Sequence, residues 1–197
     1  MLLVCLALVC PAFATVVTFD DITTDPVTML PIPDNYGGLN WDNIYVMDAV
    51  DYDEPSGYKN AVVSGGYVAW GTGQAGDIGG GGDVSPSLIT ISNGDSFNFI
   101  GVYLTAGWRD DLNITIEGSR NDLLVYNQTV VIDPFGPTWF DFNYTNIDHL
   151  RFISFGGTPS YDDGYHFVLD DLTFVPEPGT VFLLGFGALA LLRKRKA

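Results

Sequence analysis

Apolar and polar residues alternate in short runs along most of the chain, and this pattern predicts β-strands. Residues Leu112–Glu117 alternate strictly, with Leu112, Ile114 and Ile116 on one side and polar residues between them, as in a strand with one buried face. Further runs are rich in β-branched and aromatic residues and are separated by Gly, Pro, Asn and Asp. They are Thr15–Phe19, Gly66–Trp70, Ser87–Ile91, Ser96–Ala106, Leu123–Ile132, Thr138–Asn143, Ile147–Phe155 and Tyr165–Val175.

About nine short strands with this spacing predict an all-β domain. No stretch has a convincing amphipathic helical pattern, so we expect an antiparallel β-sandwich, most simply a jelly-roll-like one. Residues 22–60 are rich in turn formers and are predicted to be a long loop. Trp139 is flanked by strand residues and is predicted to belong to the core.

The first 14 residues predict a signal peptide. They are apolar and end in Ala12-Phe13-Ala14, which matches an A-x-A cleavage site. No Lys or Arg precedes the apolar run, so we expect the true start to lie upstream of Met1. Cys5 and Cys10, the two cysteines of the chain, both lie in this segment. The exported chain is therefore predicted to contain no disulfide and no thiolate.

The last 22 residues predict a membrane segment. The twelve residues Val181–Leu192 are apolar and uncharged; as a helix they would rise about 18 Å, which is short for a hydrocarbon core of about 30 Å. Two prolines, Pro176 and Pro178, bound the segment on one side. Four cations, which are Arg193, Lys194, Arg195 and Lys196, bound it on the other. The positive-inside rule places these cations in the cytoplasm and residues 15–175 outside it.

The order Pro-Glu-Pro, short apolar segment, basic end resembles the PEP-CTERM sorting domain of Gram-negative bacteria, over Val175 to Lys196. This resemblance implies recognition by an exosortase, a membrane-embedded cysteine protease-transpeptidase. It implies removal of the tail near Pro176-Glu177-Pro178 and delivery to the cell surface or the extracellular polymer, with these three residues acting as substrate. An ordinary tail anchor is the alternative. The predicted division is thus 1–14 signal peptide, 15–175 exterior domain and 176–197 sorting segment.

Four segments of the exterior domain resemble jelly-roll modules common in PEP-CTERM proteins, which are related in shape to carbohydrate-binding domains. They are Phe19-Asp20-Asp21, residues 32–41, residues 103–108 and residues 169–174. This second resemblance implies a fold and no particular ligand.

The exterior domain is strongly acidic. The chain has eight basic and 24 acidic residues; four basic residues and Glu177 lie in the tail, which leaves four against 23 and a net charge of −19 for residues 15–175. Such a field repels nucleic acid and anionic lipid. It suits a soluble exterior protein that meets divalent cations or neutral sugars.

Paired aspartates are the candidate metal ligands. Calcium prefers several carboxylate oxygens, and in a jelly roll the first and last strands often pair. Such pairing would bring Asp20 and Asp21 close to Asp170 and Asp171, where a structural Ca²⁺ would relieve their repulsion. The alternative is that these carboxylates are solvated or cap turns.

Four aromatic residues in or beside predicted loops are candidates for a sugar-binding platform, because rings stack on pyranose faces. They are Trp41, Tyr45, Trp70 and Trp108. The alternative is that they close the ends of the sandwich as core residues.

Signals of catalysis are few. The sequence has no HExxH and no G-x-S-x-G, and His149 and His166 are its two histidines. We therefore expect a non-enzymatic protein, held transiently in the inner membrane and then released to the cell surface or the exopolysaccharide matrix, with a structural or adhesive role. The second hypothesis is a carbohydrate-binding module, and the third is a glycan-active hydrolase with two facing carboxylates. Wetted aromatic rings would favour the module, and buried rings the structural protein.

Overall fold

A computed structural model describes residues 13–22, 29–72, 87–91 and 96–177. Within these residues the strands form two main antiparallel sheets, with one small two-stranded sheet beside them. The seven-stranded sheet has the order β11 (Thr138–Ile147), β7 (Phe97–Ala106), β14 (Phe167–Pro176), β5 (Tyr67–Gly71), β4 (Ile44–Asp48), β2 (Leu30–Pro31), with β1 (Thr15–Val17) also on β14. The five-stranded sheet has the order β10 (Leu123–Ile132), β9 (Leu112–Arg120), β12 (His149–Phe155), β6 (Ser87–Ile91), β3 (Leu39–Asp42). The small sheet pairs β8 (Arg109–Asp110) with β13 (Thr158–Pro159).

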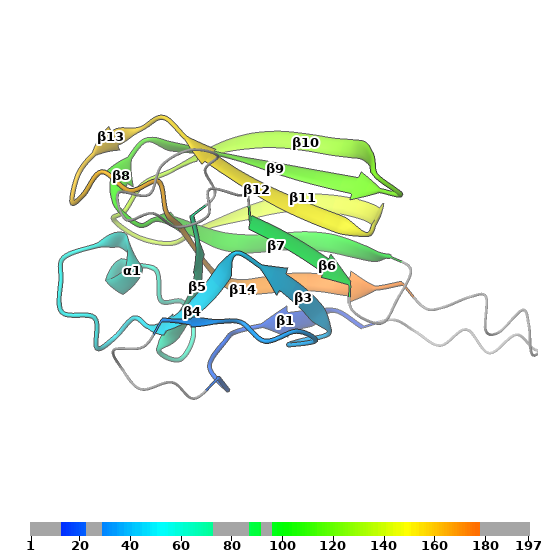
Figure 1. Cartoon of the computed structure of the whole chain (residues 1–197), viewed down its shortest axis with the longest axis horizontal. Helices are drawn as coiled ribbons and strands as arrows, with labels where there is room; N and C mark the ends of the chain where they lie inside the picture. The colour runs from blue at the N-terminus through cyan, green and yellow to red at the C-terminus, as the bar shows by residue number, and fades with distance from the viewer. Residues whose placement is uncertain (1–12, 23–28, 73–86, 92–95, 178–197) are drawn as a thin grey trace, which may run out of the picture.

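The two main sheets share one hydrophobic core. Figure 1 shows β9 and β10 along the top of the view, with β7 and β14 beneath them. Phe97 and Phe99 of β7 and Ile114 and Ile116 of β9 are fully buried in one cluster, because alternate residues of each strand point to the same face. The predicted all-β, antiparallel, sandwich-like fold is confirmed, while jelly-roll connectivity stays a prediction.

The first and last described strands pair with one another. β1 runs antiparallel to β14, with Thr15 opposite Phe174 and Val17 opposite Leu172. This pairing was expected from the sequence and is confirmed. It places the beginning of the exterior domain beside the end of its last strand.

The prediction that residues 22–60 form one long loop is wrong in part. This stretch contains β2, β3, β4 and the four-residue helix α1 (Gly57–Asn60). β4 lacks an apolar–polar alternation because both of its faces are covered: Val46 and Met47 are neighbours in sequence, and both are buried. A strand buried on two sides has no polar side to reveal its period.

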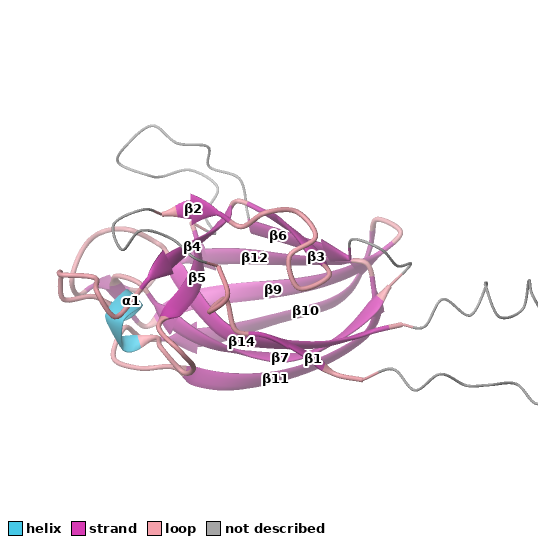
Figure 2. Cartoon of the chain, turned by 90° about the horizontal axis from the view of Figure 1, so that it is seen from below, coloured by secondary structure: helices cyan, strands magenta, loops and turns pink. Residues whose placement is uncertain are grey.

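A second hydrophobic cluster lies on the outer face of the seven-stranded sheet. In β5, Ala69 belongs to the main core whereas Val68 and Trp70 belong to the second cluster, as strand alternation requires. Residues 49–66, here called the covering segment, lie over this face and contribute Tyr58 of α1. Figure 2 shows α1 at one end of the sheets.

Candidate functional site

The predicted sorting segment begins inside the fold. β14 runs to Pro176, which lies opposite Phe97 at the start of β7. The backbone N–H of Glu177 donates to the carbonyl oxygen of Ser96 (3.0 Å), and Asn98 Nδ2 donates to Glu177 Oε1 (2.6 Å). The start of β7 therefore holds the first two residues of the predicted motif. Pro178, residues 181–192 and the cations Arg193, Lys194, Arg195 and Lys196 lie outside the described residues, as do residues 1–12 of the predicted signal peptide.

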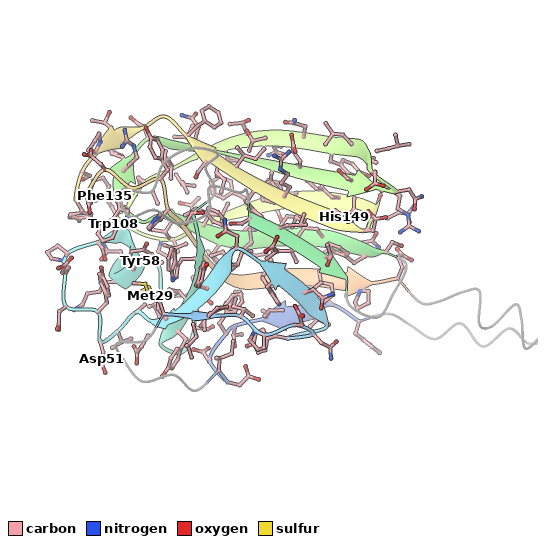
Figure 3. The ribbon with its side chains drawn as sticks, in the orientation of Figure 1. Met29, Asp51, Tyr58, Trp108, Phe135 and His149 are labelled. Carbon is pink, nitrogen blue, oxygen red and sulfur yellow. The ribbon has the colours of Figure 1, made fainter. Side chains whose placement is uncertain are left out.

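Three of the four predicted aromatic ligands come together on the outer face of the seven-stranded sheet. Tyr45 stacks on Trp70 with ring centroids 5.0 Å apart, and Trp70 and Trp108 both contact Tyr58 edge-on, at 5.9 Å and 5.1 Å. Figure 3 shows Tyr58 and Trp108 at the end of the molecule that holds α1. Trp70 and Trp108 are only 8% and 9% exposed, because the covering segment packs against them.

Trp41, the fourth predicted aromatic ligand, lies apart from this cluster. It is 6% exposed and packs in the main core, edge-on to Phe19 at 5.5 Å. Its Nε1–H donates to the carbonyl oxygen of Tyr36 (3.0 Å). The structure thus leaves little ring surface of the three tryptophans open to a ligand, and their role in sugar binding stays a prediction.

His166 anchors the aromatic cluster through one nitrogen. Trp108 Nε1–H donates to His166 Nδ1 (3.1 Å), and the hydroxyl of Tyr58 bonds to the same atom. Because Nδ1 accepts a hydrogen bond from Trp108, the ring proton of the neutral imidazole sits on Nε2. Burial lowers the pKa of His166 to about 4, so this imidazole is neutral at physiological pH. Burial also raises the pKa of the Tyr58 hydroxyl.

Three of the four predicted calcium ligands gather around one serine. Ser64 Oγ lies 2.7 Å from Asp171 Oδ1 and 3.3 Å from Asp20 Oδ2. Asp20 Oδ1 also accepts the N–H groups of Gly66 (2.9 Å) and Tyr67 (3.2 Å). A Cβ at Gly65 would lie 1.8 Å from Asp20 Oδ1, so only glycine lets the turn approach this carboxylate.

Asp170 is the most buried member of this acidic group, with 1% exposure. Its Oδ2 accepts the N–H groups of Val63 (2.8 Å) and Ser64 (3.2 Å), and its Oδ1 accepts that of Asp171 (2.8 Å). Burial outweighs these hydrogen bonds and raises the pKa of Asp170 to about 6. The carboxylate ties the end of the covering segment to β14.

Asp21 points elsewhere and accepts a hydrogen bond from the hydroxyl of Tyr36. In the described part of the chain no group of three His, Cys, Asp or Glu side chains could hold a metal ion. Asp20 and Asp170 have an evident structural use, as acceptors for the backbone N–H groups of residues 63, 64, 66 and 67. Calcium binding at Asp20, Asp21, Asp170 and Asp171 stays a prediction.

The prediction that Trp139 belongs to the core is wrong. Trp139 is half-buried and lies opposite Tyr103 on β7, with ring centroids 5.1 Å apart. Its Nε1–H donates to Asp141 Oδ1 (2.9 Å). A Cβ at Gly101 would lie 2.6 Å from the Trp139 ring, so the indole rests directly on the β7 backbone.

Sequence reasoning missed this pair on the outer face of the seven-stranded sheet. A usable signal was the spacing of Trp139 and Asp141, which places both side chains on one side of a strand.

Residues 174–196 match the profile described as the PEP-CTERM protein-sorting motif. The chain carries a PEP-CTERM protein-sorting motif. This motif implies that an exosortase processes the protein and that the protein is exported to the cell surface or the extracellular space. The matched PEP-CTERM stretch starts at Phe174, within β14, so the motif and the exterior domain overlap.

Outside the PEP-CTERM motif the comparisons are weak. No curated protein matches the chain. An arabinose-bound MgGH51 α-L-arabinofuranosidase is 10% identical, with a TM-score of 0.42, over 83% of this chain and 26% of the enzyme. A CBM4 structure is 19% identical, with a TM-score of 0.28, over 70% of this chain and 87% of that one. In the described residues, no helix has the length and apolar character needed to cross a membrane.

Proposed function

We propose that the exported protein is a non-catalytic structural or adhesive component of the cell surface or the extracellular matrix. The observation that carries this proposal is the burial of Trp41, Trp70 and Trp108. Rings packed in this way stabilise a fold and offer no open face on which a sugar could stack. Packing in the main core explains the presence of Trp41, and packing under the covering segment explains that of Trp70 and Trp108.

The ionisable groups also favour a role without catalysis. Asp170 and His166, whose pKa values burial displaces, both form hydrogen bonds that hold neighbouring segments in place. His149 bonds to Asp148 (2.6 Å) at the end of the molecule away from Trp108 (Figure 3). A glycan-active hydrolase is therefore the less favoured function.

A deletion strain tests the structural role. We expect the matrix to lose cohesion, while the chain length of its glycan stays unchanged, and we expect the wild-type gene to restore cohesion. Glycan chain length is measured by size-exclusion chromatography of purified polymer. Unchanged cohesion together with altered glycan length would point to an enzyme instead.

We further propose that residues 181–192 hold the precursor in the inner membrane until the exosortase removes the tail. The protein collected from the cell surface should then end near Pro176 and lack residues 193–196. Intact-mass spectrometry of the surface fraction checks this expectation. A surface protein that retains the complete tail would contradict it.

Carbohydrate binding is the second candidate function, and the Tyr103–Trp139 pair favours it. These are half-buried rings on an outer sheet face, and the exposed carboxylate of Asp141 holds the indole of Trp139. A ring on a flat sheet face, next to a hydrogen-bonding group, is suited to stack on a neutral sugar. The host's exopolysaccharide is the proposed ligand.

A pull-down of the full chain on that exopolysaccharide tests this candidate, with Ca²⁺ and with chelator. We expect Trp139→Ala to lose retention and Phe135→Ala to keep it, because Phe135 is an exposed aromatic residue (61%) outside the pair. Retention that survives in Trp139→Ala would remove this site, and an effect of chelator would support a role for calcium.

A further inference from the structure

β10 is an edge strand of the five-stranded sheet in the described part of the chain. It spans ten residues, Leu123–Ile132, and among the described strands it pairs with β9 alone. Figure 1 shows it along the upper margin of the molecule. The outward row of backbone N–H and C=O groups on such a strand is a template for pairing with another strand.

The other long edge strand is protected against pairing in ways that β10 is not. β11, at the edge of the seven-stranded sheet, has two register irregularities and carries Asp141. Its residues Asn143 and Asn146 have positive φ angles of 52° and 56°, which interrupt the regular strand backbone. Bulges and charges of this kind are how natural sheets keep their edges unpaired.

The remaining edge strands are short. β3 has four residues and ends in Asp42, β2 has two residues including Pro31, and β1 has three residues. β10 is as long as β11, has one irregularity, between Leu124 and Tyr126, and contains no charged residue and no proline. Among the described edges it is the one that combines length, regularity and neutrality.

Side chains on β10 reinforce this difference. Four large apolar residues of the strand are more than half exposed, and they are Leu123 (71%), Leu124 (55%), Val125 (52%) and Val131 (54%). The solvent-exposed polar residues Asn127, Gln128 and Thr129 lie between them, all uncharged. Apolar groups gathered along an open edge are typical of an interaction surface.

We propose that β10 pairs antiparallel with β10 of a second copy of this chain, which joins two five-stranded sheets into one. An antiparallel edge strand can serve as its own partner, because a twofold axis lets the same edge supply both sides of the contact. Exterior domains with a net charge of −19 repel one another, so copies can approach closely only where the contacting strands are neutral. β10 supplies such a strand on both sides of the contact.

The geometry of this pairing is self-limiting. Two ten-residue strands overlap over about 30 Å. A twofold axis through their centre places one residue, Asn127 or Gln128, opposite itself on the other copy, whereas residues farther from the axis face different residues. The contact closes at two copies because it uses the free edge of each. The dimer is an inference in addition to the proposed structural role. If the protein is a monomer, the proposals on its sorting and on its role in the matrix still stand.

Sedimentation velocity of the full chain in a mild detergent tests the proposal. We expect a species of twice the chain mass, and we expect Val131→Lys to weaken dimerisation by about tenfold or more, because a cation at the edge opposes strand pairing. Val50→Lys is the matched control, since Val50 is equally exposed (53%) but lies in the covering segment. A monomer at all concentrations, or equal effects of the two variants, would overturn the proposal.

Disulfide cross-linking on host cells provides a second measurement that does not depend on detergent. Single cysteines are placed at Asn127 or Gln128, the two positions at the centre of the strand, with Val50→Cys as the control and with Cys5 and Cys10 changed to alanine. Opposed residues in an antiparallel pair have Cα atoms about 5 Å apart, within the reach of a disulfide. We expect dimers of this chain at the β10 positions in excess of the control. Cross-links to a protein of different mass, or no excess over Val50→Cys, would exclude the second copy.

Discussion

Asp170 and His166 are buried titratable residues with opposite consequences for stability. Burial raises the pKa of Asp170 to about 6 and lowers that of His166 to about 4. Each group therefore favours its neutral form in the folded protein. In the unfolded chain both return to ordinary values, and the difference between the two states makes stability depend on pH.

Asp170→Asn should remove one part of this pH dependence. Between about pH 4 and pH 6 the folded protein keeps the Asp170 proton while the unfolded chain loses it, so this residue lowers stability as pH rises. We expect the difference in unfolding free energy between wild type and Asp170→Asn to shrink across this interval. Urea unfolding at several pH values measures it, and a difference that is constant with pH would contradict the raised pKa.

For His166 we expect the opposite dependence of stability on pH. Its folded pKa lies below the unfolded value, so the unfolded chain takes up a proton first, and stability falls as pH decreases from about 6.5 towards 4. His166→Gln should lose this dependence. NMR titration of the imidazole gives the pKa directly, and a value near 6.5 would show that the ring is not buried against Trp70 and Trp108.

At the scale of the element, the covering segment depends on one side chain more than on its helix. α1 has four residues, too few to be stable alone. Tyr58 is 1% exposed and contacts the rings of Tyr52, Trp70 and Trp108. Packing of this residue, with the Asp170 contacts at Val63 and Ser64, holds residues 49–66 on the sheet.

Tyr58→Ala should therefore destabilise the covering segment selectively. We expect a loss of roughly 3–5 kcal/mol, the range for removing a large aromatic residue from a core. Hydrogen exchange should accelerate in residues 49–66 before it does in β7 or β9. Tyr161→Ala, at an exposed residue (41%), should change neither.

Strands with one buried face were predictable from their alternation; of the strands buried on both faces, β5 was predicted from its composition as Gly66–Trp70, whereas β4, among the turn formers of residues 22–60, was missed. The strict alternation of Leu112–Glu117 matches β9, whose inward residues are Leu112, Ile114 and Ile116. β4 was missed because the covering segment buries its outer face as well. The sequence pattern of a strand records its own burial and carries no information on which distant segment covers it.

The same limit applies to the candidate sites: the local sequence pattern does not show which distant segments they contact. The approach of Asp20 to Asp171 could be predicted, because it follows from the pairing of the first and last strands. Their shared partner Ser64 could not, since a turn more than 40 residues from Asp20 and more than 100 from Asp171 supplies it. The Tyr103–Trp139 pair was hidden in the same way, because the register of β7 with β11 sets it.

At the scale of the whole molecule, a net charge of −16 opposes compactness through self-repulsion. Raising NaCl from about 10 mM to about 200 mM shortens the screening length from roughly 30 Å to less than 10 Å. We expect the melting temperature to rise by roughly 2–4 °C, equivalent to about 1 kcal/mol. CaCl₂ at matched ionic strength tests the predicted calcium site: an additional rise that chelator reverses would support it, and an identical rise would reflect screening alone.

The pairing of β1 with β14 also bears on the orientation of the exterior domain relative to the membrane. Thr15 and Phe174 are opposite one another, and the PEP-CTERM motif continues from β14 without a spacer. In the anchored precursor proposed above, the end of the sandwich with these residues is therefore nearest the bilayer. α1 lies at the other end (Figure 2), about the length of a ten-residue strand, roughly 33 Å, farther out. The covering segment thus belongs to the end of the precursor farther from the bilayer, and an antibody against it should label intact spheroplasts before the tail is removed.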